Sequence, residues 1–175
     1  MARRDKADDA TPMGAALSFL DARPRTVREV EEKLDALDFG EYEISETVRR
    51  LGELGLLNDA LYAAEFVRTR LATKPVSRRK LYEQMYAHKL SKEVISDALE
   101  TVSDGYEKKN ALAVAEKFAR QFATLDEEER RVRVMRRLVG RGYAYQASKE
   151  ALETLFNNSC GLENCTEDEE DDGKA

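Results

Sequence analysis

VEEKLDALDF, at positions 30–39, has an apolar spacing that recurs twice further along the chain. After its first valine, apolar residues follow four and nine positions on, at Leu34 and Phe39. LYEQMYAHKL (81–90) and VMRRLVGRGY (134–143) repeat this spacing, and the three copies begin 51 and 53 residues apart. A step of four follows one face of a helix, and the ninth residue falls in the turn after it. The copies therefore predict three similar helix–turn units.

Each unit extends into a three-helix module, because helical periodicity continues on both sides of it and residues that break helices fall between the segments. Stacked neighbours would stabilise modules that are each too small to fold well alone. We predict module 1 (11–56) with helices at 13–20, 27–37 and 42–54, module 2 (57–104) with helices at 59–71, 78–88 and 92–102, and module 3 (105–157) with helices at 106–122, 127–140 and 145–156. The predicted caps are Thr11, Thr26, Ser77 and Ser91.

The composition also favours an all-α protein, since Pro and Gly are scarce and strong helix formers predominate. The charged fraction of 37% predicts a molecule elongated enough to expose much helical surface. Seven acids and one lysine follow Cys160, so this tail alone carries the net charge of −6 and the remainder is neutral. Segments 1–10 and 158–175 are polar and lack periodicity, which predicts disorder. The acidic tail either keeps the protein in solution or competes with nucleic acid for basic surfaces.

Residues 1–10 contain no apolar run after their basic residues, so we expect no secretory leader, and no uncharged run reaches the roughly 18 residues that a membrane span needs. We therefore predict a soluble, cytoplasmic protein without membrane contact. Cys160 and Cys165 would need two further ligands to hold structural zinc, so we predict no metal site. A single histidine, His88, near a predicted helix end favours a structural or solvated role over catalysis. No enzyme activity and no cofactor are predicted.

Three stretches carry a resemblance to the RecX regulatory proteins. RLGELGLLNDALYAAEFVRTR (50–70) is similar to the "LGLLDD" and "FA..FV..R" pattern of that family, although Asn58 replaces the usual acid. ALSFLDARPRTVREVEEKL (16–34) and SRRKLYEQMYAHKL (77–90) resemble the opening of the family and its second module. The likeness spans about residues 13–156, and the third module matches mainly in its apolar pattern.

The resemblance implies three tandem three-helix modules in an elongated, curved array. It also implies a non-catalytic regulator that binds RecA recombinase and mainly the RecA–DNA filament. Separately from the resemblance, we predict a monomer. Members of the family damp the ATPase, strand-exchange and co-protease activities of RecA. The family supplies no catalytic residues, so the candidate contact residues come from the charge pattern alone.

Two groups of basic residues are candidates for contact with RecA or DNA. On a helical wheel, the arginines of 127–141 other than Arg131 share one arc, and the apolar residues occupy the opposite arc, with Arg131 beside the apolar stripe. Guanidinium groups suit phosphates and acidic protein surfaces, although a plain solvated face is the alternative. The second group lies around the predicted start of a helix, where cations oppose the helix dipole. The candidates are Arg130, Arg133, Arg136, Arg137 and Arg141, with Lys74, Arg78, Arg79 and Lys80 in the second group.

In the predicted helix 59–71 and the residues just before it, a shared stripe is expected to face the core, made of Leu57, Leu61, Ala64, Val67 and Leu71. Tyr62 and Phe66 then form a second packing surface towards a neighbouring module. The arginines that end this helix are expected to point outward, as solvent or salt-bridge groups rather than partner contacts.

Two other functions remain open from the sequence. Each module is similar to a helix-turn-helix fragment, so the alternative to a RecA regulator is a helical DNA-binding protein that acts without RecA. Direct contact with single- or double-stranded DNA would be weak, since the body of the chain is neutral. A helical scaffold for another partner is the third hypothesis.

Overall fold

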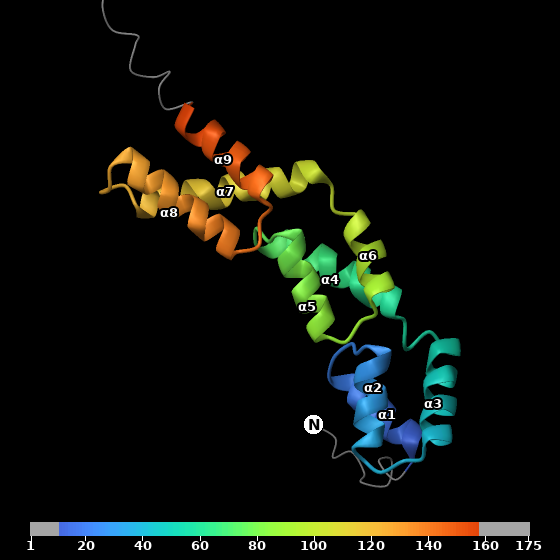
Figure 1. Cartoon of the computed structure of the whole chain (residues 1–175). Helices are drawn as coiled ribbons and strands as arrows, with labels where there is room; N and C mark the ends of the chain where they lie inside the picture. Colours follow the sequence, from blue (N-terminus) through green and yellow to red (C-terminus); the bar gives the residue numbers. More distant parts are fainter. Residues whose placement is uncertain (1–10, 158–175) are drawn as a thin grey trace, which may run out of the picture. The chain divides into compact units, whose positions relative to one another are not determined.

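The computed structural model describes residues 11–157, which form nine helices and contain no strand. The predicted disordered segments 1–10 and 158–175, with Cys160 and Cys165, lie outside the described residues. The helices, labelled in Figure 1, are α1 (Pro12–Ala22), α2 (Val27–Asp35), α3 (Glu41–Glu53), α4 (Asp59–Thr73), α5 (Arg78–Ala87), α6 (Lys92–Glu100), α7 (Asp104–Gln121), α8 (Glu127–Gly140) and α9 (Tyr145–Asn157).

The all-α prediction is confirmed, and each helix begins and ends within two residues of its predicted position. The caps explain this agreement, because they satisfy the first free N–H groups of a helix at positions set by local sequence. Thr11 accepts a hydrogen bond from Gly14 N–H at 3.1 Å, and Ser91 accepts one from Val94 N–H at 3.3 Å. Pro12 occupies the first turn of α1, where its missing N–H costs nothing.

The repeated turn after the middle helix of each module is visible in the backbone. Asp38, Lys89 and Gly142 each have positive φ, at 61°, 62° and 84°. The next residue donates its N–H back to the carbonyl five positions earlier, which is the Schellman pattern of helix ends. These bonds run from Phe39 to Leu34 (3.4 Å), from Leu90 to Met85 (3.4 Å) and from Tyr143 to Leu138 (3.2 Å). The apolar residues found in the sequence repeat therefore serve one structural purpose in all three copies.

The first of two compact units contains the described residues 11–74 and 80–102. In it α1, α2 and α3 pack against one another (blue to teal in Figure 1), and α4 packs against α6. The core of the α1–α3 bundle is fully buried at Val30, Leu34 and Leu51. Module 1 and most of module 2 thus share one compact unit, and the boundary between them at 56 and 57 stays a prediction.

The second compact unit contains residues 75–79 and 103–157. Helices α7, α8 and α9 pack against one another around a core that includes Phe118, Val134, Leu138 and Phe156. The start of α5 belongs to this unit as well, since Ser77 is buried and its hydroxyl donates to the carbonyl of Arg141 at 2.9 Å. Among residues 11–157, no helix is long and apolar enough to cross a bilayer.

Candidate partner-binding surface

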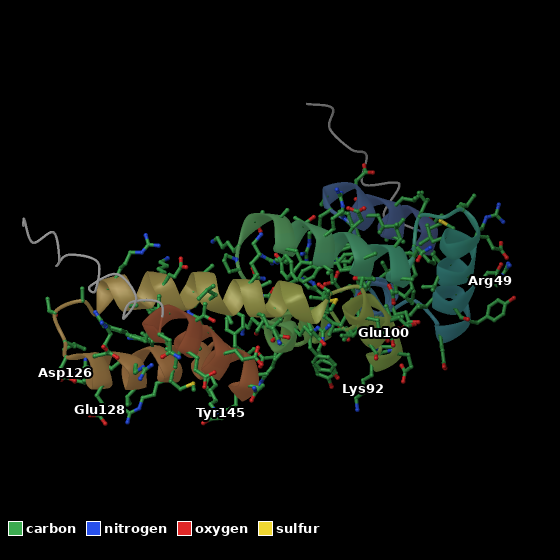
Figure 2. The ribbon with its side chains drawn as sticks, turned by 90° about the horizontal axis from the view of Figure 1, so that it is seen from above. Arg49, Lys92, Glu100, Asp126, Glu128 and Tyr145 are labelled. Atoms are coloured by element: carbon green, nitrogen blue, oxygen red, sulfur yellow. The ribbon has the colours of Figure 1, made fainter. Side chains whose placement is uncertain are left out.

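The candidate surface is built on α8, and its local sequence sets where this helix begins. Asp126 accepts a hydrogen bond from Glu129 N–H at 2.9 Å, and three glutamates follow in the first turn, where they suit the helix dipole. Asp126 and Glu128 mark this end of α8 in Figure 2. Residues 127–141 contain six arginines against these three glutamates, which leaves a net charge of +3.

The buried face of α8 differs from the wheel prediction. Val134 and Leu138 are fully buried, but Val132 and Val139 keep 45% and 47% of their surface exposed. One turn of apolar side chains is enough to contact α7 and α9, so the far side of the predicted stripe has no neighbour to pack against. The helix is therefore rotated, with the arginine arc closer to the core than predicted.

This rotation places four arginines against aromatic rings at the edges of the core. Guanidinium groups over ring faces gain cation–π attraction, and their stems cover apolar surface. The distances from guanidinium carbon to ring centroid lie between 4.7 and 5.8 Å, with Arg137 and Arg141 over Phe118 and Arg130 and Arg131 over Phe156. The rings hold these side chains in place while their charge remains at the surface.

Arg133 and Arg136 extend away from the rings and are exposed. Arg133 forms an ion pair with Glu129, with 2.7 Å between Nη2 and Oε1. Arg136 makes no ion pair with any of the residues 11–157. The α8 surface, defined as Arg130, Arg133, Arg136, Arg137 and Arg141, thus combines ring-held and extended guanidinium groups.

The second predicted basic group is largely paired with acids. Arg78 lies 2.8 Å from Asp104 and 3.9 Å from Glu107, and Lys80 lies 2.9 Å from Glu83. Lys74 is exposed at the end of α4. These pairs lower the charge that the group offers to an anionic partner.

Arg79 lies beside the turn that follows α8. Its side chain lies against the turn at Gly142, since a Cβ built there would be 3.3 Å from the Arg79 Cβ. Arg79 therefore lies beside the C-terminal end of α8, next to the last residues of the α8 surface.

His88 lies at the centre of a junction between helices. The sequence predicts a structural or solvated role for this residue but not the junction. His88 O accepts a hydrogen bond from Thr26 Oγ1 at 2.8 Å, and Nδ1 lies 3.1 Å from a Glu29 carboxylate oxygen. The imidazole packs edge-on against Tyr62 and Phe66, at centroid distances of 5.8 and 5.5 Å. This junction joins α2 to α4 and α5, and so joins module 1 to module 2.

A second bond of the junction holds the start of α2 to the start of α4. Val27 N–H donates to Asp59 Oδ1 at 2.9 Å. Burial raises the pKa of Asp59 above its usual value, although the bond from Val27 opposes that rise. The sequence marks Asp59 only as part of a helix start, so no local signal identifies this partner 32 residues away.

The predicted α4 stripe is partly correct, since Leu57 and Val67 are buried. Ala63 and Val67 are buried, whereas Leu61 is 59% exposed and Ala64 is exposed. Tyr62 and Phe66 do form the second packing surface, with rings stacked 6.4 Å apart at an angle of 16°. Arg68 and Arg70 are exposed as expected, with Arg68 paired to Glu65 at 2.5 Å.

Comparison with known proteins identifies similar chains. Residues 13–51 match a family model described as the first three-helix domain of RecX, and residues 58–99 match its second three-helix domain. "Regulatory protein RecX" of Chlorobium phaeobacteroides is 29% identical over 152 residues, covering 86% of this chain and 97% of the relative.

Two solved structures are similar in fold. The crystal structure of RecX from Lactobacillus salivarius superposes with a TM-score of 0.80 at 27% identity, over 86% of this chain and 98% of that one. A second crystal structure of a regulatory protein RecX has a TM-score of 0.71 at 21% identity and covers 85% of this chain. The two family models describe tandem three-helix domains, and both structures share the fold of this chain.

Proposed function

Because this chain belongs to the RecX family of regulatory proteins, we propose that it regulates RecA recombinase by binding it, mainly as the filament that RecA forms on DNA. Binding would inhibit the ATPase, strand-exchange and co-protease activities of RecA. The family membership supports the role of a regulator, and the α8 surface is the observation that supports an anionic or acidic partner.

The α8 surface suits this role because its charge is concentrated and partly fixed. No acid lies between Arg130 and Arg141 in the sequence, and the rings of Phe118 and Phe156 hold four of the six arginines of 127–141. Side chains that are already ordered lose less conformational entropy when a partner binds. Guanidinium groups bind carboxylates and phosphates through paired hydrogen bonds, so both RecA and its DNA offer suitable acceptors.

The proposed mechanism involves no covalent chemistry. The protein would lie in the groove of the filament and touch more than one RecA protomer. Contacts spread over tandem modules raise the effective concentration of each later contact after the first has formed. An occupied groove would block subunit exchange and entry of the second DNA strand.

Charge reversal on α8 tests the proposal. We expect the triple variant Arg133→Glu, Arg136→Glu, Arg137→Glu to bind RecA filaments on single-stranded DNA about tenfold to a hundredfold more weakly. Loss of three surface charge contacts of about 0.2–1 kcal/mol each gives a change of this order. Fluorescence anisotropy or biolayer interferometry at 0.15 M salt would measure it, with circular dichroism to verify helix content.

A matched control separates the α8 surface from net charge. Lys109, Lys117 and Lys149 are exposed lysines of α7 and α9 in the same compact unit. Their triple change to glutamate alters the net charge equally and should leave filament binding within about threefold of the parent. Equal losses in both triple variants would remove the α8 surface from the mechanism.

The alternative function is DNA binding without RecA. It predicts that affinity for naked DNA falls steeply with salt, with a slope set by the number of phosphates neutralised. Titrating the protein into a RecA ATPase assay with single-stranded DNA, beside a DNA-binding measurement without RecA, distinguishes the two. Inhibition at concentrations that give no binding to naked DNA supports the RecA regulator.

A further inference from the structure

A groove with aromatic and aliphatic walls lies in the first compact unit, between segment 23–25 and α4. Its volume is about 550 Å³, within the range of pockets that hold small ligands or the anchor side chains of peptides. We call it the α4 groove. None of the basic residues predicted from the sequence to contact RecA or DNA lines it.

The walls of the α4 groove expose apolar side chains. Leu61 is 59% exposed and Leu56 is 50% exposed, and both line the groove with Pro24. Leu56 follows Gly55, whose positive φ of 70° turns the chain at the end of α3. Single exposed leucines are ordinary, but two on one groove beside aromatic rings indicate a surface that a partner covers.

The floor of the groove is ordered by the His88 junction. The rings of Tyr62 and Phe66 are half-buried, stack on each other and both contact the edge of His88. Glu29 and Thr26 hold His88 in turn. A floor that is fixed before binding costs a ligand little ordering entropy.

The rim of the groove is basic. Arg23, Arg25 and Arg70 line it against the single acid Glu65, which gives the lining a net charge of +2. Arg23 and Arg25 share Glu29 at 3.8 and 4.0 Å, so that one carboxylate offsets two guanidinium groups.

Arg70 carries the least compensated charge on this rim. Its guanidinium carbon lies 5.0 Å from the centre of the Phe66 ring, and it makes no ion pair with the residues 11–157. The positive charge therefore lies beside the apolar floor.

We propose that the α4 groove binds a short segment of a partner protein in which a bulky apolar side chain is flanked by carboxylates. The apolar side chain would occupy the space between Leu61 and the Phe66 ring, and the carboxylates would pair with Arg70 and Arg23. This proposal rests on the proposed function, since RecA would be the protein that supplies the segment. Aliphatic walls favour a peptide over nucleic acid, whose bases stack on exposed ring faces.

Peptide titrations test the groove without RecA. The probes are two synthetic peptides, Asp-Glu-Leu-Phe-Asp-Glu and Lys-Lys-Leu-Phe-Lys-Lys, added to the isotope-labelled full chain and followed by NMR. We expect the acidic peptide to shift the amide signals of Leu61 and Phe66 in a saturable way and to bind at least tenfold more tightly than the basic one. Arg70→Glu should reverse that preference, and Arg68→Glu, on the same helix but outside the groove, should preserve it.

Filament binding tests the link to RecA. Leu61→Glu should weaken binding to the RecA–DNA filament at least tenfold. Leu54→Glu is its matched control, because Leu54 is similarly exposed at 62% but does not line the groove, and it should stay within twofold of the parent. Circular dichroism and thermal unfolding verify that both variants are folded.

The outcomes separate the two proposals. Selective peptide binding by a parent protein that fails to bind RecA would overturn the proposed function and leave the groove assignment standing for another partner. Absence of saturable shifts at Leu61 and Phe66, or equal affinity for both peptides, would overturn the groove assignment. It would also be overturned if oligo(dT) competed at these signals, or if truncation after Asn157 moved them as an internal ligand would.

Discussion

Replacing Thr26 with valine would test the junction that joins modules 1 and 2. Thr26 is fully buried, and its hydroxyl makes two hydrogen bonds. It donates to His88 O at 2.8 Å and accepts from Glu29 N–H at 3.2 Å, as the cap of α2. Valine has nearly the same shape but can make neither bond.

The expected loss follows from these two bonds. Loss of the cap costs about 1 kcal/mol, and a buried carbonyl left without its donor costs about 1–3 kcal/mol more. We therefore expect the free energy of unfolding to fall by about 2–4 kcal/mol. For a chain of this size, that corresponds to a fall in Tm of roughly 5–15 °C.

Urea unfolding followed by far-UV circular dichroism would measure the change, with Thr26→Ser as the matched control. Serine keeps the hydroxyl and loses only a methyl group, so it should cost no more than about 1 kcal/mol. If the valine variant were within about 0.5 kcal/mol of the serine variant, the hydroxyl would not hold the junction together and the reasoning would fail.

Two further predictions concern Gly142 and Tyr143 of the second compact unit, with Gly55 of the first unit as a comparison. Gly142→Ala should lower the free energy of unfolding by about 2–4 kcal/mol, because φ is 84° and the new Cβ would meet Ser77 Oγ at 2.9 Å. Gly55→Ala is the comparison: at φ 70° and in open space, it should lower the free energy of unfolding by only about 1 kcal/mol. Equal shifts in Tm for the two variants would contradict this prediction. Burial raises the pKa of Tyr143 to about 12, so the native state holds that proton more tightly than the unfolded state. The contribution of Tyr143 to the free energy of unfolding is fully present below pH 10 and should fall by roughly 2–3 kcal/mol between pH 10 and 12. Urea titrations at each pH would measure this fall. Tyr143→Phe should lack that difference, and at pH 7 it should be at least as stable, because the buried hydroxyl has no partner among residues 11–157.

The helices were predictable from sequence because their causes are local. Caps such as Thr11 and Ser91, breakers such as Pro24 and the apolar step of four all act within a few residues. The repeated turn was predictable for the same reason, since its hydrogen bond closes over five residues.

The faces of the helices were harder to predict, because burial depends on which neighbour packs against a helix. Leu61 fits a helical stripe, yet α4 packs through Ala63 and Val67 and leaves Leu61 exposed at the α4 groove. Val139 is exposed for a similar reason, and the arginine arc of α8 moved towards the rings of Phe118 and Phe156. An amphipathic pattern gives the existence of an apolar side more reliably than its centre.

The His88 junction and the α4 groove could not be predicted from a single sequence. Thr26 and His88 are 62 residues apart, and nothing in the residues around His88 indicates that its carbonyl accepts a buried hydroxyl. Segment 23–25 and α4 line the same groove, although they are distant in the sequence. The predicted candidates consequently favoured runs of basic residues over a groove that combines distant segments.

The hydroxyls of Thr26 and Ser77 each link one module to the next. Each donates a hydrogen bond to a backbone carbonyl near the turn of the following module. Both residues precede the first apolar position of their repeat by four, and the same position in the third repeat is Arg130. Arg130 lies inside α8 with its guanidinium over Phe156, so the third module has no donating hydroxyl at this position. Attaching a fourth module through the same kind of hydrogen bond would require a rebuilt start of α8 with a serine or threonine at position 130.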